Sequence, residues 1–125
     1  MKERVKKEIE KILKMIQEAR KYTEPFHPAK LFELCEKILA YQAWLIQPFL
    51  EAETAYRQKI VDFKNEEILE KEKITKRSNV EAESMAKTTE EYRDYKYINY
   101  VYELMTEQIL LVKKFADKLE QEYKQ

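Results

Sequence analysis

Residues 29–63 read AKLFELCEKILAYQAWLIQPFLEAETAYRQKIVDF, and the spacing of their apolar side chains decides the fold. Apolar residues recur every three or four positions along the whole stretch, which is the period of one face of an α-helix. Pro48 interrupts the stretch, but the stripe keeps its phase on both sides, which favours a kinked helix over two separate ones. We expect one long helix from about residue 29 to about residue 72, with a stripe formed by Leu31, Leu34, Ile38, Tyr41, Leu45, Phe49, Ala52, Tyr56, Ile60 and Phe63.

The chain before this stretch predicts one more helix and a break. An apolar stripe over residues 2–22 steps by threes and fours from Val5 to Ala19. Pro25 and Pro28 then stand three apart, and they cannot both lie inside a helix. The first helix therefore ends near residue 22, and Pro28 suits the first turn of the long helix.

The chain after the stretch predicts a break, a short helix and a second long helix. Residues 74–77 form the break, and Ser78 with Glu81 three positions later is a capping box that begins a short helix. Thr88 and Glu91 repeat the pattern before a last helix over about residues 89–123, with an apolar stripe formed by Ile98, Val101, Met105, Ile109, Val112, Phe115 and Leu119. Two long helices with a short connection pack antiparallel, within one chain or by exchange between two chains.

The composition supports an all-α fold. The chain has 125 residues and no glycine, the residue that supplies left-handed turns and phosphate-cradling loops. This disfavours most β architectures and excludes the dinucleotide fingerprint, the P-loop and the nucleophile elbow. We predict a single all-α domain over residues 1–125, either an elongated helical hairpin or a three-to-four-helix bundle with a long kinked central helix. Its length leaves apolar surface exposed, so we expect a homo-oligomer.

Charge and cysteine usage predict the compartment. The chain has 24 basic and 24 acidic residues, so its net charge gives no general attraction to nucleic acid or to an anionic membrane. Cys35 is the only cysteine, which fits a reducing cytoplasm. No run of about 18 apolar residues is present, and the charged N-terminus lacks the apolar core of a signal peptide. We expect a cytoplasmic protein with no membrane partner.

Catalytic constellations are not evident. Cys35 fits a small core residue, and the only histidine, His27, lies in the proline-flanked turn, so no nucleophile is paired with a base. Two carboxylate pairs at helical spacing resemble the cation ligands of all-helical nucleotide pyrophosphohydrolases, but such pairs arise freely among 24 acidic residues. We predict no catalytic residue, no metal and no cofactor, and keep a metal-dependent nucleotide hydrolase as a third hypothesis that would use Glu33, Glu36, Glu91 and Asp94.

Aromatic side chains give the favoured candidate site. Residues 92–102 read YRDYKYINYVY, with tyrosines on more than one face of the predicted helix. Such a helix suits a packing or subunit interface, since tyrosine combines an apolar body with a polar tip, or else a stacking platform for single-stranded nucleic acid. The segment around Trp44 is the most apolar of the chain and suits core or a partner anchor. The predicted partner-binding residues are Trp44, Phe49, Tyr92, Tyr95, Tyr97, Tyr100 and Tyr102.

Basic side chains give an alternative site for nucleic acid. One row steps by threes and fours along the first helix, a second group lies near the break, and two more cations lie among the tyrosines. Any of them could contact phosphate, although solvated helix faces also explain them. The alternative nucleic-acid-binding residues are Arg4, Lys7, Lys11, Lys14, Lys71, Lys73, Lys76, Arg77, Arg93 and Lys96.

A resemblance to a protein group completes the interpretation. The segments EAETAYR (51–57) and SNVEAESMAK (78–87), followed by a long closing helix, resemble small helical proteins encoded by phages, often near recombination and DNA-metabolism genes. The resemblance covers roughly residues 50–123, and it implies an accessory protein of a mobile element in the host cytoplasm. It brings no catalytic residue. The leading hypothesis is a non-enzymatic phage-type binding protein that acts through protein contacts, as an inhibitor of a host defence or nucleic-acid-processing complex or as an adaptor. The alternative is a nucleic-acid-binding accessory protein of phage recombination or DNA metabolism.

Overall fold

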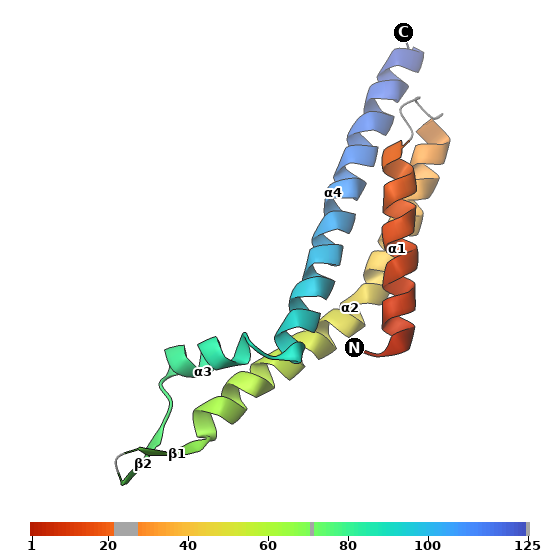
Figure 1. Cartoon of the computed structure of the whole chain (residues 1–125). Helices are drawn as coiled ribbons and strands as arrows, with labels where there is room; N and C mark the ends of the chain where they lie inside the picture. Colours follow the sequence, from red (N-terminus) through yellow and green to blue (C-terminus); the bar gives the residue numbers. More distant parts are fainter. Residues whose placement is uncertain (22–27, 71, 125) are drawn as a thin grey trace. The chain divides into compact units, whose positions relative to one another are not determined.

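The computed structural model of the chain describes residues 1–21, 28–70 and 72–124. Within these residues the protein is mostly helical, as predicted, with one small antiparallel sheet in addition. The elements follow one another as α1 (Glu3–Lys21), α2 (Pro28–Asn65), β1 (Glu67–Glu70), β2 (Lys73–Lys76), α3 (Asn79–Ala86) and α4 (Glu90–Lys124) (Figure 1).

The three longest helices lie where the apolar spacing predicts them. α1 and α4 cover nearly all of the predicted ranges 2–22 and 89–123. α2 begins at Pro28, where a proline costs no helical hydrogen bond, and it continues through Pro48 without ending. The unchanged phase of the stripe therefore predicted correctly that Pro48 lies inside one helix.

The end of α2 was predicted wrongly. The helix ends at Asn65 rather than near residue 72, and residues 67–76 form a hairpin rather than the end of a helix and a break. The register brings opposite charges together at both ends of the ladder and apolar side chains together in between, which stabilises a strand pair. The pairs are Glu67 with Lys76, Ile68 with Thr75, Leu69 with Ile74, and Glu70 with Lys73.

The turn of the hairpin is made without glycine. Glu72 has φ 67°, in the left-handed region that glycine usually occupies. A non-glycine residue there costs about 1–2 kcal/mol. The absence of glycine therefore disfavours a hairpin without excluding one, because the cross-strand pairs offset a cost of this size.

Arg77 fastens the base of the hairpin to the end of α2. Its guanidinium donates to the Glu66 carboxylate at 2.8 Å and to the Phe63 carbonyl oxygen at 3.3 Å. The same group lies 5.5 Å from the centre of the Phe63 ring, a cation–π distance. Arg77 is mostly buried by these contacts, with 16% of its side chain exposed.

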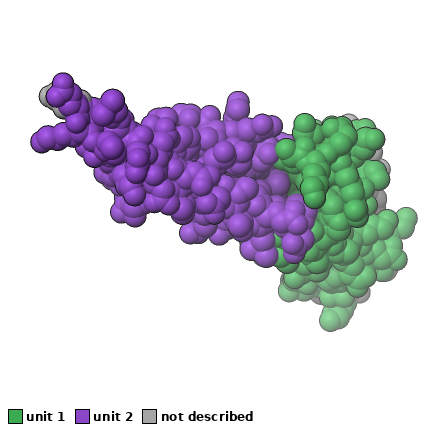
Figure 2. All heavy atoms as spheres, turned by 90° about the horizontal axis from the view of Figure 1, so that it is seen from below, with its two compact units in different colours: residues 1–46, 100–125 green, residues 47–99 purple. Residues whose placement is uncertain are grey.

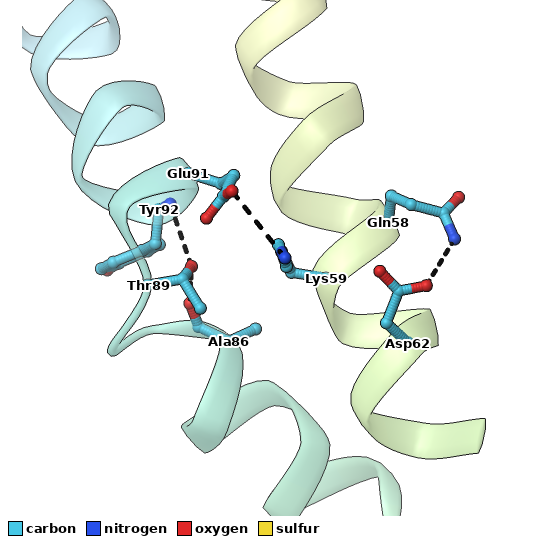
Figure 3. Close-up of polar contacts among 7 residues, drawn as sticks. All are labelled: Gln58, Lys59, Asp62, Ala86, Thr89, Glu91 and Tyr92. Atoms are coloured by element: carbon cyan, nitrogen blue, oxygen red, sulfur yellow. Dashed lines mark hydrogen bonds and ion pairs between the residues drawn. The ribbon is translucent and has the colours of Figure 1, made fainter. Parts of the chain in front are cut away.

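Hydroxyl caps begin the last two helices. The Ser78 hydroxyl accepts from the Glu81 backbone N–H at 3.2 Å, which confirms the predicted cap of α3. α4 is capped one residue later than the repeated pattern suggests, because the Thr89 hydroxyl, not that of Thr88, accepts from the Tyr92 N–H at 3.3 Å (Figure 3). Thr88 instead donates to the Met85 carbonyl at the end of α3.

The chain divides into two compact units (Figure 2). Unit 1 contains residues 1–46 and 100–125, and unit 2 contains residues 47–99. The division falls inside α2 and α4, so unit 2 is one continuous segment and unit 1 combines the two ends of the chain. The single domain expected from the chain length stays a prediction.

The core of unit 1 lies between α1, the first half of α2 and the second half of α4. The Gln42 side chain donates to the Tyr102 carbonyl at 3.4 Å and to the Thr106 hydroxyl at 2.7 Å. Cys35, which lies earlier on α2, contacts Ile109, which lies later on α4, so the two helices are antiparallel as predicted. The interior is made almost entirely of aliphatic side chains, and Gln108 is its one buried polar side chain among the described residues. Its buried apolar residues are Ile9, Ile12, Ile16, Cys35, Ile38, Leu45, Val101, Met105, Ile109, Val112, Ala116 and Leu119.

Candidate interaction surfaces

An aromatic cluster joins α2 and α4 in unit 2. The Tyr56 and Tyr95 rings are stacked, with centroids 5.4 Å apart and planes 7° from parallel. Tyr92 lies 5.0 Å from Tyr56, and Phe49 lies 5.7 Å from Tyr95. The four rings are half-buried, and the Tyr56–Tyr92 and Phe49–Tyr95 pairs are tilted by 47° and 40°, arrangements that are usual for packed aromatic side chains. Three predicted partner-binding residues (Phe49, Tyr92 and Tyr95) therefore form this packing cluster.

Tyr56 is the member of the cluster that was not predicted as a site residue. It lies on the predicted apolar stripe of α2, and pairing this stripe with the tyrosine face of α4 would have found it. Burial raises the pKa of the Tyr56 phenol, and the neighbouring Tyr92 phenol raises it further. The phenol is therefore neutral at physiological pH.

The remaining predicted aromatic residues are divided between the two units. Tyr97 belongs to unit 2, whereas Trp44, Tyr100 and Tyr102 belong to unit 1. Tyr97 and Tyr100 are exposed, while Trp44 and Tyr102 are half-buried. The separation of Tyr97 and Tyr100 from the other tyrosines of α4 follows the two faces predicted from helical geometry.

A row of exposed apolar side chains runs along α2 in unit 1, and it was not predicted. We call Phe32, Leu39, Ala43 and Ile46 the α2 row. Phe32, Leu39 and Ile46 are 36%, 43% and 46% exposed and repeat every seven residues, so they share one side of the helix. A sequence signal was present, because Leu39 and Ile46 each follow a core residue by one position (Ile38 and Leu45).

A second set of exposed apolar residues lies on α4. Leu110, Leu111 and Phe115 are exposed, although Phe115 was predicted to lie on the buried stripe. Ala116 is buried in its place. Leu110 and Leu111 are consecutive and so diverge by about 100° around the helix, which makes this set less regular than the α2 row.

The predicted basic residues differ in their interaction partners. Lys73 and Lys76 lie opposite glutamates in the hairpin. Arg77 donates hydrogen bonds to the Glu66 carboxylate and the Phe63 carbonyl oxygen. Lys96 lies 5.9 Å from the centre of the Tyr92 ring, and Lys71 lies outside the described residues. The remaining predicted cations are exposed. Arg93 lies on α4, and the other four share one face of α1: Arg4, Lys7, Lys11 and Lys14.

The four predicted carboxylate ligands are divided between the two units. Glu33 and Glu36 belong to unit 1, and Glu91 and Asp94 belong to unit 2. Glu91 instead receives an ion pair from Lys59 at 3.8 Å (Figure 3). Among the residues that the structure describes, no three histidine, cysteine, aspartate or glutamate side chains are grouped to hold a metal ion. The hydrolase hypothesis therefore gains no support from the arrangement.

Cys35 lies in the core of unit 1, as predicted. Its side chain is 3% exposed, and its sulfur donates to the Ile109 carbonyl oxygen at 3.7 Å. Burial raises the pKa of the Cys35 thiol, partly opposed by the charge of Lys113. Such a thiol is a poor nucleophile, and His27, the only histidine, lies outside the described residues.

Cys35 predicts a loss of stability in alkaline solution. Because its native pKa is raised, the folded protein keeps the thiol proton after the unfolded chain has lost it. The stabilisation is complete below about pH 8.5, the pKa of an ordinary thiol, and disappears as the pH rises through the native pKa. Between pH 8 and pH 10, we expect the free energy of unfolding to fall less for Cys35→Ala than for the wild type. The difference is about 1.4 kcal/mol for each pH unit between the thiol pKa of the folded protein and that of the unfolded chain. Urea unfolding at several pH values measures this, and parallel pH profiles would contradict it.

Comparisons with protein-family models, with characterised proteins and with solved structures found no match. No helix in the described ranges is both long and apolar enough to cross a membrane.

Proposed function

We propose that this chain is a non-enzymatic binding protein of phage type that acts through protein–protein contacts in the host cytoplasm. The phage assignment rests on the resemblance of residues 50–123 described above. The observation that supports a binding role is the α2 row, since large apolar side chains exposed in a regular row are typical of interaction surfaces. An inhibitor of a host defence or nucleic-acid-processing complex, or an adaptor, would act by such contacts.

The spacing of the α2 row favours a helix as the bound element. Leu39, Ala43 and Ile46 are separated by four and three residues, and Phe32 lies seven residues before Leu39. This is the pattern that packs knobs into the holes of a neighbouring helix. Ala43 leaves room for close approach between the two helices. We propose a helix of a partner protein as the occupant, and a second copy of this chain as the competing one.

The test replaces the row by charge and keeps a matched control. The variant is Leu39→Glu with Ile46→Glu, and the control is Leu110→Glu with Leu111→Glu, two residues that are at least as exposed in the same unit. A photoreactive amino acid at position 43 reports the partner by crosslinking in host extract, and light scattering reports self-association. We expect the wild type and the control to give the same crosslinked protein, and the α2-row variant to lose it at least about tenfold.

Two results would change the proposal. Crosslinks of equal yield in the α2-row variant would show that the row does not carry binding. A wild-type crosslink only to a second copy, with a dimer mass that falls to the monomer mass in the variant, would make the row a self-association surface instead.

A further inference from the structure

The exposed cations on α1 form a continuous basic row that is separate from the α2 row. Arg4, Lys7, Lys11 and Lys14 follow one another by three, four and three residues. At 100° per residue they lie within about 80° of one another, on the side of α1 opposite its buried residues. All four are exposed. We call these four residues the basic row.

Among the side chains that the structure describes, one ion pair involves a cation of the basic row. Lys11 forms an ion pair with Glu8 at 3.2 Å. Arg4, Lys7 and Lys14 form no hydrogen bond or ion pair with the side chains that the structure describes. This distinguishes the row from the other predicted cations, of which Lys73, Lys76 and Arg77 face glutamates of the hairpin region.

The spacing of the row fits the charge density of a nucleic-acid strand. Ten residues separate Arg4 from Lys14, which is about 15 Å along a helix that rises 1.5 Å per residue. One strand of a DNA duplex carries a phosphate about every 3.4 Å along the axis, and therefore about four phosphates in that length. Four cations on a rigid helix can each lie near a phosphate without any ordering of a loop.

The surroundings of the row favour nucleic acid over a membrane surface. A helix that binds a bilayer inserts an apolar face beside its basic face. The isoleucines of α1 (Ile9, Ile12 and Ile16) are buried in the core of unit 1, and Val5, Leu13 and Met15 are half-buried. α1 therefore offers charge without an apolar face for insertion, and contact with phosphates needs only the charge.

We propose that the basic row of α1 is a binding surface for the phosphate backbone of nucleic acid, independent of base sequence. Phosphate contacts carry no sequence information, so unrelated duplexes bind alike. The surface uses neither the tyrosines of α4 nor the cations of the hairpin, and it lies on a different helix from the α2 row. Nucleic-acid binding by the basic row and protein binding by the α2 row are therefore independent proposals. A result for one does not decide the other, so they are tested separately.

The test measures the anisotropy of a labelled DNA duplex between 50 and 200 mM salt. Four phosphate contacts predict a slope of about −3.6 for the logarithm of the affinity against the logarithm of the salt concentration. This corresponds to a loss of about 150-fold over that fourfold range of salt. Replacing all four cations by glutamine, a good helix former, is expected to remove this salt dependence and to weaken binding at 50 mM at least about tenfold.

A charge-matched control separates the basic row from a general effect of net charge. Glutamine at Lys30, Lys37, Lys114 and Lys118 removes the same four charges from exposed positions of unit 1. We expect this control to keep the wild-type slope, and circular dichroism to show equal helix content in both variants. Equal weakening in the two variants, a flat salt profile in the wild type, or binding to anionic vesicles that exceeds binding to duplex would each overturn the proposal.

Discussion

Replacing Leu45 by alanine is expected to lower the free energy of unfolding by about 2–5 kcal/mol. Leu45 is fully buried on α2 in the core of unit 1. The substitution removes apolar contacts and leaves a cavity that the surrounding helices fill only in part. Because small domains are stable by about 5–15 kcal/mol in total, a loss of this size is a large fraction of the stability.

Leu39→Ala is the matched control for this prediction. Leu39 is on the same helix and in the same unit, and alanine replaces leucine in both variants, so the change in helix propensity is the same. Its side chain is 43% exposed, and we expect a loss below about 1 kcal/mol. Urea unfolding followed by circular dichroism gives both values. Equal losses would mean that the two faces of α2 are buried alike, and the α2 row would then be part of a core.

The helices could be predicted because their signals are local. The stripe over residues 29–63 and its constant phase across Pro48 favoured one long helix, which the structure confirms, and the Ser78 hydroxyl caps α3 as the capping box indicates. The antiparallel pairing of α2 and α4 was predicted from a short connection, although the connection contains the hairpin and α3. The bonds from Gln42 to Tyr102 and Thr106, with the bond from Cys35 to Ile109, confirm the pairing in unit 1.

The hairpin could not be predicted by the same arguments. Residues 66–73 are rich in glutamate and lysine, which favour helix, and no glycine marks a turn. Its stabilising pairs, such as Glu67 with Lys76, join residues nine apart and appear only when the register is known. The ion pair from Arg77 to Glu66 is a further non-local contact that local propensity does not contain.

Of the two candidate surfaces, the basic row of α1 could be predicted from the sequence and the α2 row could not. The basic row of α1 has one helical period and could be identified from spacing alone. The α2 row lies one residue away from the core stripe, so that both rows merge into one apolar pattern in the sequence. Only the burial of Ile38 beside the exposure of Leu39 separates them.

The second large effect is expected in unit 2, where Tyr56→Ala should lower the free energy of unfolding by about 2–3 kcal/mol. The substitution removes the ring that stacks on Tyr95 and also lies 5.0 Å from Tyr92. Each aromatic pair contributes about 0.5–1.5 kcal/mol beyond the apolar area that it buries. Because Tyr56 is half-buried, the loss is smaller than the 3–5 kcal/mol typical of a fully buried phenylalanine.

Two controls decide what the tyrosines of α4 do. Tyr56→Phe keeps the ring stack and is expected to cost less than about 1 kcal/mol, whereas Tyr97→Ala, at an exposed position of the same unit, is expected to change stability by less than about 0.5 kcal/mol. Urea unfolding and near-ultraviolet circular dichroism of the three variants measure these effects. If Tyr56→Ala left stability unchanged and instead weakened binding to single-stranded DNA, the cluster would be a stacking platform for bases. A stability loss confined to Tyr56→Ala assigns the cluster to packing, because the folded protein then depends on the contacts of this ring with Tyr95 and Tyr92.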